Sequence, residues 1–204
     1  MLTLFYAPGA CSLASHIVLE ESGEKYEGKR VNLAAGEQRT EAFLKINPQG
    51  RVPALQLDNG EFLSENTAIL PYLGKRFGMW PTDPIQEARA LSLIGFLAAS
   101  VHPAHAHTGR PERYADDVAV HPALKAKGRE TFLGYLKLID QRLAGREWML
   151  DSYTPVDPYA LVMYSWGPRH QFDVTELKNY TAFKDRMVAR PAVQRALADE
   201  NIKL

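Results

Sequence analysis

Residues 2–14, LTLFYAPGACSLA, predict a strand, a loop and the start of a helix in immediate succession. The apolar run Leu2–Tyr6 has the length of a short buried strand, and the proline and glycine of Ala7–Ala10 end it. Apolar residues then recur at helical spacing through Ser12–Ser22, and Gly23 stands where helices commonly end on a left-handed residue. The chain therefore opens in the manner of an α/β domain.

The residues that follow continue this alternation of strands and helices. A second strand is predicted at Tyr26–Leu33 and a short helix at Thr40–Ile46. Two further strands, Val52–Leu57 and Glu61–Leu63, flank an Asp-Asn-Gly turn, which is typical of a β-hairpin. A third helix, Thr67–Phe77, closes the series. A βαβ unit followed by a ββα unit is the thioredoxin-like arrangement.

The second half of the chain is helical in pattern throughout. Two prolines within residues 79–84 forbid helix continuation, so we place a linker there, between a thioredoxin-like α/β domain of residues 1–78 and an all-helical domain of residues 85–204. Thr154–Asp157 resembles a capping box and predicts the start of a buried helix. The helix Ile85–Val101 carries small residues that would let another helix or a second subunit approach closely, namely Ala88, Ser92, Gly95 and Ala99.

Composition narrows the classes of partner. The chain has 204 residues with 24 Lys and Arg against 24 Asp and Glu, which gives no electrostatic reason to expect nucleic acid or an anionic membrane as a partner. No apolar stretch approaches the roughly 20 residues that span a bilayer, and no secretory signal is visible, so we expect a cytoplasmic protein. The single cysteine, Cys11, cannot form a disulfide within the chain.

Cys11 lies at the predicted start of a helix, where backbone N–H groups stabilise an anion. We therefore expect a lowered pKa for its thiol. The alternative is that Cys11 is a small buried hydrophobic residue, as most free cysteines are. Ser12 and Tyr6 lie close to Cys11 in the sequence and are further candidates for a catalytic role. The alternative for Ser12 is that it caps the helix, and the alternative for Tyr6 is that its ring packs in the core.

Two further stretches suit the binding of a short peptide. We expect the Val52–Pro53 bond to be cis, leaving the N–H and C=O of Val52 free to pair with an extended peptide, whereas an ordinary proline at a strand edge is the alternative. In Ser64–Thr67 the helix start can hold a carboxylate while Glu65 receives an ammonium group, and plain capping is the alternative. With Cys11, these stretches describe a site for a short peptide that contains a thiol.

These motifs resemble those of bacterial beta-class glutathione transferases. The resemblance rests on Phe5–Ala14, Asn47–Leu55 and Ser64–Leu70, extends through Thr154–Asp157 and Tyr159–Trp166, and covers essentially the whole chain. It implies the glutathione transferase fold, with glutathione and an electrophilic small molecule as substrates, and a homodimer.

The resemblance also implies roles for particular residues. Cys11 would face the glutathione sulfur and be able to form a mixed disulfide with it, and His102 would approach the thiol from the second domain. Ser12 and Tyr6 occupy positions that are catalytic in other classes of glutathione transferase, so they are alternative candidates for the catalytic role. The residues expected to bind glutathione are Arg51, Val52, Pro53, Glu65 and Asn66.

Two positions depart from the family's pattern. Pro103 stands where a basic residue is common, and it should kink or end the helix near His102 and bias His102 away from helical geometry. Asn66 replaces a more usual Ser or Gly, and its amide can still hydrogen-bond a carboxylate. The imidazoles of His102, His105 and His107 do not align on one helical face, so we expect no metal.

We thus expect an enzyme that conjugates the glutathione thiolate to electrophilic, largely apolar small molecules. A monothiol glutathione-dependent disulfide reductase acting through Cys11 is one alternative, since Ala14 stands where a Cys-x-x-Cys pair has its second cysteine. A non-catalytic protein that binds glutathione or apolar ligands is the other.

Overall fold

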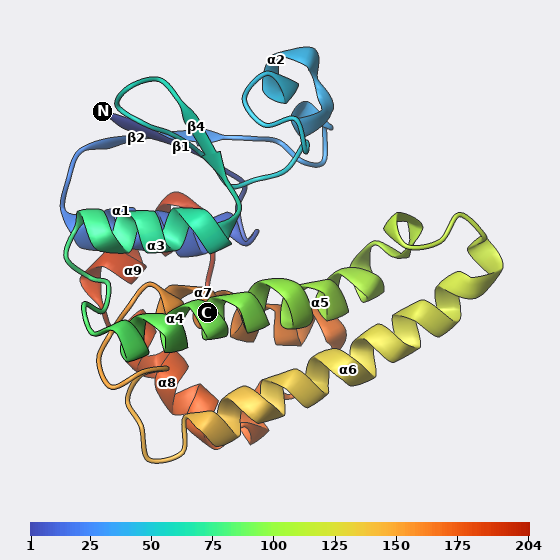
Figure 1. The fold of residues 1–204 in the computed structure, drawn as a ribbon. Helices are drawn as coiled ribbons and strands as arrows, with labels where there is room; N and C mark the ends of the chain where they lie inside the picture. Colours follow the sequence, from blue (N-terminus) through green and yellow to red (C-terminus); the bar gives the residue numbers. More distant parts are fainter.

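A computed structural model describes all 204 residues and shows a four-stranded sheet followed by a helical half (Figure 1). The strands lie in the order β2-β1-β3-β4, with β1 parallel to β2 and the other neighbours antiparallel. They are Leu2–Tyr6 (β1), Tyr26–Arg30 (β2), Ala54–Gln56 (β3) and Phe62–Ser64 (β4). The thioredoxin-like arrangement expected from the sequence is confirmed.

Helices cover both faces of this sheet. α1 (Ser12–Ser22) and α3 (Asn66–Arg76) lie side by side on the face turned toward the helical half, and α2 (Glu41–Leu44) lies across the sheet from them (Figure 1). Neighbouring residues of β1 serve the two faces, because side chains alternate along a strand. Leu4 enters the main hydrophobic core, whereas Phe5 packs edge-on against an aromatic ring of α2.

The second half consists of helices. Short 3-10 turns connect them at Pro111–Arg113, Val118–Val120, Gly167–His170 and Val174–Glu176. A further 3-10 turn, Glu37–Arg39, lies in the first half and precedes α2. The α-helices are α4 (Pro84–Phe96), α5 (His102–Gly109), α6 (His121–Arg142), α7 (Val156–Trp166), α8 (Lys178–Val188) and α9 (Pro191–Asp199). α5 and α6 pack against each other as an antiparallel pair (Figure 1). None of the helices is long and apolar enough to cross a membrane.

The Thr154–Asp157 box starts α7 as expected. Asp157 is fully buried, and its carboxylate accepts hydrogen bonds from the N–H groups of Thr154 and Met149, each at 2.8 Å. A buried carboxylate held by backbone donors fixes both the start of the helix and the loop before it. α7 packs against α1, so it joins the helical half to the sheet domain through one continuous hydrophobic core.

Pro103 does not end the helix, which was one of the two outcomes expected from the sequence. α4 passes through a π-helix, Leu97–Val101, directly into α5, and His102 has helical angles of φ −62° and ψ −45°. A π turn is wider than an α turn, so it moves the carbonyls of the preceding turn away from the proline ring. The clash is relieved before His102, and the predicted bias of this residue away from helical geometry is wrong.

Candidate functional site

The loop between β1 and α1 is held by the far end of the chain. The carbonyl of Gly9 accepts hydrogen bonds from the indole N–H of Trp166 and from Arg169, both at 3.0 Å, and its N–H donates to Glu200 at 2.9 Å. Gly9 has φ +67°, which favours glycine, and a Cβ there would lie 2.5 Å from the Arg169 guanidinium and displace it. The loop that presents Cys11 is therefore fixed between the two halves.

Cys11 directly precedes α1 and is half-buried. Its thiol donates to the carbonyl of Val52, with Sγ and O 3.4 Å apart. Burial raises the pKa of Cys11 to about 12, the negative charge of Glu65 adds to the rise, and the backbone N–H groups at the helix start oppose it. The lowered pKa expected from the helix start is therefore wrong, because desolvation outweighs it. The thiol is protonated at neutral pH and acts as a hydrogen-bond donor.

Val52 presents its main chain beside this thiol. The Val52–Pro53 bond is cis, as expected. The N–H of Val52 makes no hydrogen bond with any other group of the protein, and its carbonyl accepts only the thiol of Cys11. An extended peptide can satisfy this main-chain N–H, since unpaired buried backbone groups are costly.

Glu65 and Asn66 begin α3 in different ways. Glu65 has φ +68°, in the left-handed region that residues with a Cβ rarely adopt, and its exposed carboxylate forms no ion pair or hydrogen bond within the protein. Such backbone strain often marks a functional position. Asn66 is buried, and its amide accepts from Ser15 at 2.7 Å and donates to the carbonyl of Cys11 at 2.9 Å. The Asn66 side chain, expected to bind a carboxylate, instead ties the Cys11 turn to α3.

Ser12 and Tyr6, the rivals for the catalytic role, do not line the cavities around Cys11. Ser12 is fully buried, and its hydroxyl accepts from the N–H of Ala7 at 3.1 Å and donates to the carbonyl of the same residue at 3.3 Å. Tyr6 packs its ring on His16, and burial raises its pKa, with the charge of Glu200 adding to the rise. The sequence neighbours of Cys11 thus serve the fold rather than the site.

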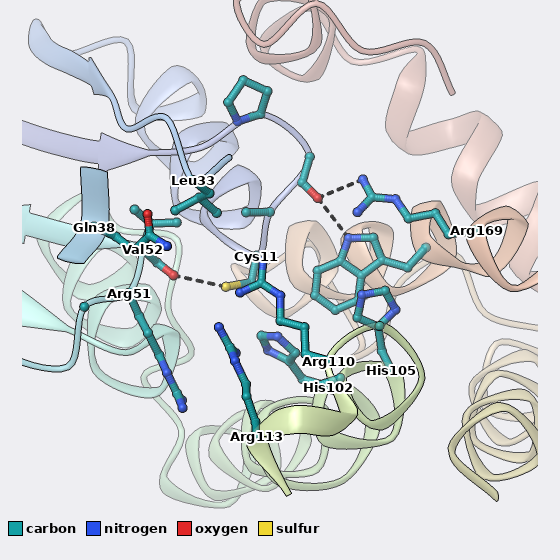
Figure 2. Close-up of a pocket in the computed structure, with 17 residues that line it drawn as sticks. Cys11, Leu33, Gln38, Arg51, Val52, His102, His105, Arg110, Arg113 and Arg169 are labelled. Atoms are coloured by element: carbon teal, nitrogen blue, oxygen red, sulfur yellow. Dashed lines mark hydrogen bonds between the residues drawn. The ribbon is translucent and has the colours of Figure 1, made fainter. Parts of the chain in front are cut away.

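Two adjoining cavities open around Cys11. The smaller, of about 120 Å³, reaches the expected glutathione-binding residues Val52, Pro53, Glu65 and Asn66. The larger, of about 260 Å³, extends from Cys11 toward the end of α5 (Figure 2). The residues that line both cavities are Cys11, Arg51, Val52, His102, Ala106 and Arg113. The structure therefore gathers the site between the sheet domain and the helical half.

His102 lies in both cavities with Cys11, on the side of the helical half (Figure 2). Burial lowers its pKa to about 4, and the positive charges of Arg51, Arg113 and Arg110 contribute in the same direction. At neutral pH its imidazole is therefore uncharged and serves as a hydrogen-bonding group.

The other histidines of α5 have partners within the protein. A ring nitrogen of His105 lies 2.7 Å from one of His170, and a ring nitrogen of His107 lies 2.7 Å from the carbonyl of Pro103. His105 also stacks on Trp166, with ring centroids 4.1 Å apart. His105 and Trp166 both line the larger cavity.

Several residues that line the two cavities were not predicted from the sequence. Arg110 and Arg113 follow α5 and point toward Cys11 from the helical half (Figure 2). The sequence signal is local: Arg110 and Arg113 enclose Pro111 and Glu112 directly after a helix, but the sequence does not say which way the two arginines face. Gln38 and Arg169 of the larger cavity were also missed. The cavity expected to be largely apolar thus has a cationic lining.

Comparison with known proteins finds relatives along the whole chain. Residues 1–75 match the family model described as the glutathione S-transferase N-terminal domain. The chain is 31% identical over 208 residues to glutathione S-transferase GstA of Escherichia coli O157:H7, covering 99% of this chain and 100% of that protein.

Solved structures agree. A glutathione transferase homologue from Sulfitobacter with bound glutathione superposes with a TM-score of 0.93 at 32% identity, covering 100% of this chain and 99% of the other. A bacterial beta-class glutathione S-transferase from Sphingomonas chungbukensis gives a TM-score of 0.87 at 32% identity, covering 98% of this chain and 100% of the other.

Proposed function

This chain belongs to the glutathione S-transferase family, and from that premise we propose that it conjugates the thiolate of glutathione to electrophilic small molecules. In the reaction with an aryl chloride, a bond forms between the glutathione sulfur and the ring carbon. The carbon–chlorine bond breaks, chloride leaves with the bonding pair, and the thiol proton passes to solvent. Atoms and charge balance without any further reactant.

One observation carries the proposal: the smaller cavity brings together three groups that match the parts of glutathione. The unpaired N–H of Val52 suits the main chain of the central cysteinyl residue, and the unpaired carboxylate of Glu65 suits the ammonium group. The first N–H groups of α3 suit the carboxylate beside that ammonium, because a helix start favours an anion. The thiol of Cys11 then lies where the glutathione sulfur is needed.

The groups around Cys11 favour ionisation of the glutathione thiol over ionisation of Cys11 itself. Two thiolates side by side would repel each other, and Cys11 is kept protonated by burial and by the charge of Glu65. Its thiol can donate to the glutathione sulfur, while Arg51 and Arg113 supply positive charge. A monothiol reductase would need Cys11 as the thiolate, so this arrangement favours conjugation.

We also propose the wider organisation expected from the sequence: domains of residues 1–78 and 85–204 joined by residues 79–84, a homodimer, and a cytoplasmic location. The dimer is supported by the small residues Ala88, Ser92 and Ala99, which are exposed on α4 and the π-helix after it. Sedimentation should give twice the chain mass, and a bulky charge at Ser92→Arg should shift the protein toward the monomer.

A comparison of two reactions tests the function. The protein with glutathione and 1-chloro-2,4-dinitrobenzene should release chloride well above the uncatalysed rate, and it should reduce a glutathione mixed disulfide slowly. The opposite ranking would establish the reductase. Tight glutathione binding in calorimetry without turnover of either compound would establish a binding protein.

A further inference from the structure

The larger cavity is lined by arginines that form no ion pair within the protein. Its lining contains four arginines and no aspartate or glutamate. Arg51, Arg110 and Arg113 form no ion pair within the protein, and Arg169 makes one hydrogen bond, to the carbonyl of Gly9. The chain as a whole has zero formal net charge, so this concentration of positive charge is local.

These arginines lie close enough to act on one another. Burial lowers the pKa of Arg113, and the charges of Arg110 and Arg51 lower it further. The same three guanidinium groups act on His102 beside them. Like charges held together in a partly enclosed cavity focus a positive potential there, and an anion relieves their repulsion.

Glutathione alone does not account for all four cations. Arg51 and Arg113 line both cavities and are within the reach of the tripeptide in the smaller one. Arg110 and Arg169 line only the larger cavity, and Glu65 lines only the smaller one. They face the space left for the second substrate.

We propose that the second substrate is an electrophile that carries a carboxylate, bound in the larger cavity by Arg110 and Arg113 with Arg169 beside them. The proposal rests on the proposed function and names its substrate class. Guanidinium groups hold carboxylates through paired N–H donors, which orients as well as attracts. The reacting carbon then lies toward Cys11 and the glutathione sulfur, and the bonds made and broken are those of the conjugation given above.

A matched pair of electrophiles provides the test. 4-Chloro-3-nitrobenzoate and 4-chloro-3-nitrobenzamide differ in charge but hardly in shape, and each enzymatic rate is divided by its uncatalysed rate with glutathione. We expect kcat/KM, so corrected, to favour the benzoate by about tenfold or more, the size typical of a charge-assisted contact. Arg110→Gln should bring this ratio close to unity. Arg30→Gln, at an exposed arginine on β2 that lines neither cavity, is the control and should leave the ratio unchanged.

Binding without chemistry separates the two proposals. Calorimetry of 3-nitrobenzoate and 3-nitrobenzamide with the glutathione-saturated protein reports the anion preference alone. Preference for 3-nitrobenzoate that is lost in Arg110→Gln supports the carboxylate site even if conjugation fails. Equal handling of the charged and neutral compounds, with conjugation intact, overturns the carboxylate site and leaves the transferase standing. Loss of glutathione disulfide turnover in Arg110→Gln, with the benzoate ratio unmoved, also overturns it, because the cations would then serve a second glutathione.

Discussion

The two cavities beside Cys11 differ in the charge of the residues that line only one of them. The smaller contains the single carboxylate of the whole lining, Glu65, whereas Arg110 and Arg169 occur only in the larger. Cys11 lies where they meet, so a sulfur placed there has an acidic group on one side and a cationic cluster on the other. With the carboxylate-bearing electrophile that we propose, charge as well as shape would distinguish the two substrates.

The strongest test of this division concerns Cys11 itself. Burial and the charge of Glu65 raise its pKa from 9.0 to about 12, so the folded protein should react with iodoacetamide at pH 7 about a thousandfold more slowly than the same chain unfolded in urea. Mass spectrometry of the intact protein measures both rates. Folded and unfolded rates within tenfold of each other would mean that the positive charges of the larger cavity, and not burial and Glu65, control the pKa of Cys11.

The folded protein disfavours protonation of His102, because a protonated imidazole would add another positive charge to the larger cavity. The pKa of His102 is lowered from 6.5 to about 4, so between these pH values the unfolded chain holds a proton that the folded chain does not. Stability should therefore fall as pH drops through this window, by up to about 3 kcal/mol from this residue. Urea unfolding of wild type and His102→Gln from pH 7 to 4 checks it, and parallel curves would show that His102 does not contribute.

Removing the charge of Glu65 should weaken glutathione binding in the smaller cavity. Glu65→Gln keeps the size of the side chain but loses the charge that we propose receives the glutathione ammonium, so glutathione affinity should fall roughly 10- to 150-fold. Calorimetry measures the affinity. Glu41→Gln, an exposed acid paired with Lys45 on α2, is the control and should bind as wild type does. An unchanged affinity in Glu65→Gln would remove Glu65 from the site.

The loop shared by both cavities allows a smaller, structural test. Gly9 and Gly23 have almost the same positive φ, but a Cβ at Gly9 meets Arg169 at 2.5 Å and one at Gly23 meets nothing within 4 Å. Both alanine variants carry the backbone cost, so Gly9→Ala should lose about 1 kcal/mol more stability than Gly23→Ala, because the displaced Arg169 gives up its hydrogen bond to the carbonyl of Gly9. Equal losses of stability in urea unfolding would show that the loop and Arg169 accommodate the added Cβ without cost.

Much of the fold was predictable because its signals are local. The β1-loop-α1 unit, the left-handed Gly23 and the Thr154–Asp157 box each depend on residues within a few positions of one another. The helix through Pro103 was not predictable, since a π turn of the preceding segment absorbs the proline. Propensity gives the cost of a proline in a helix, but not where the backbone adjusts.

The sequence by itself indicated a short peptide with a thiol as the ligand. The motifs around Cys11, Val52 and Glu65 state the required groups, and the structure brings these three to one cavity. It also indicated His102, which lines the same cavity as Cys11.

Only the tertiary structure decided how these groups behave. The pKa of Cys11 depends on burial and on Glu65, which is far along the chain, and these outweigh the helix start that the sequence displays. The cationic lining depends on Arg110 and Arg113 folding back over Cys11. Desolvation and Coulomb interactions act through space, so they are fixed by which segments meet and not by their order in the chain.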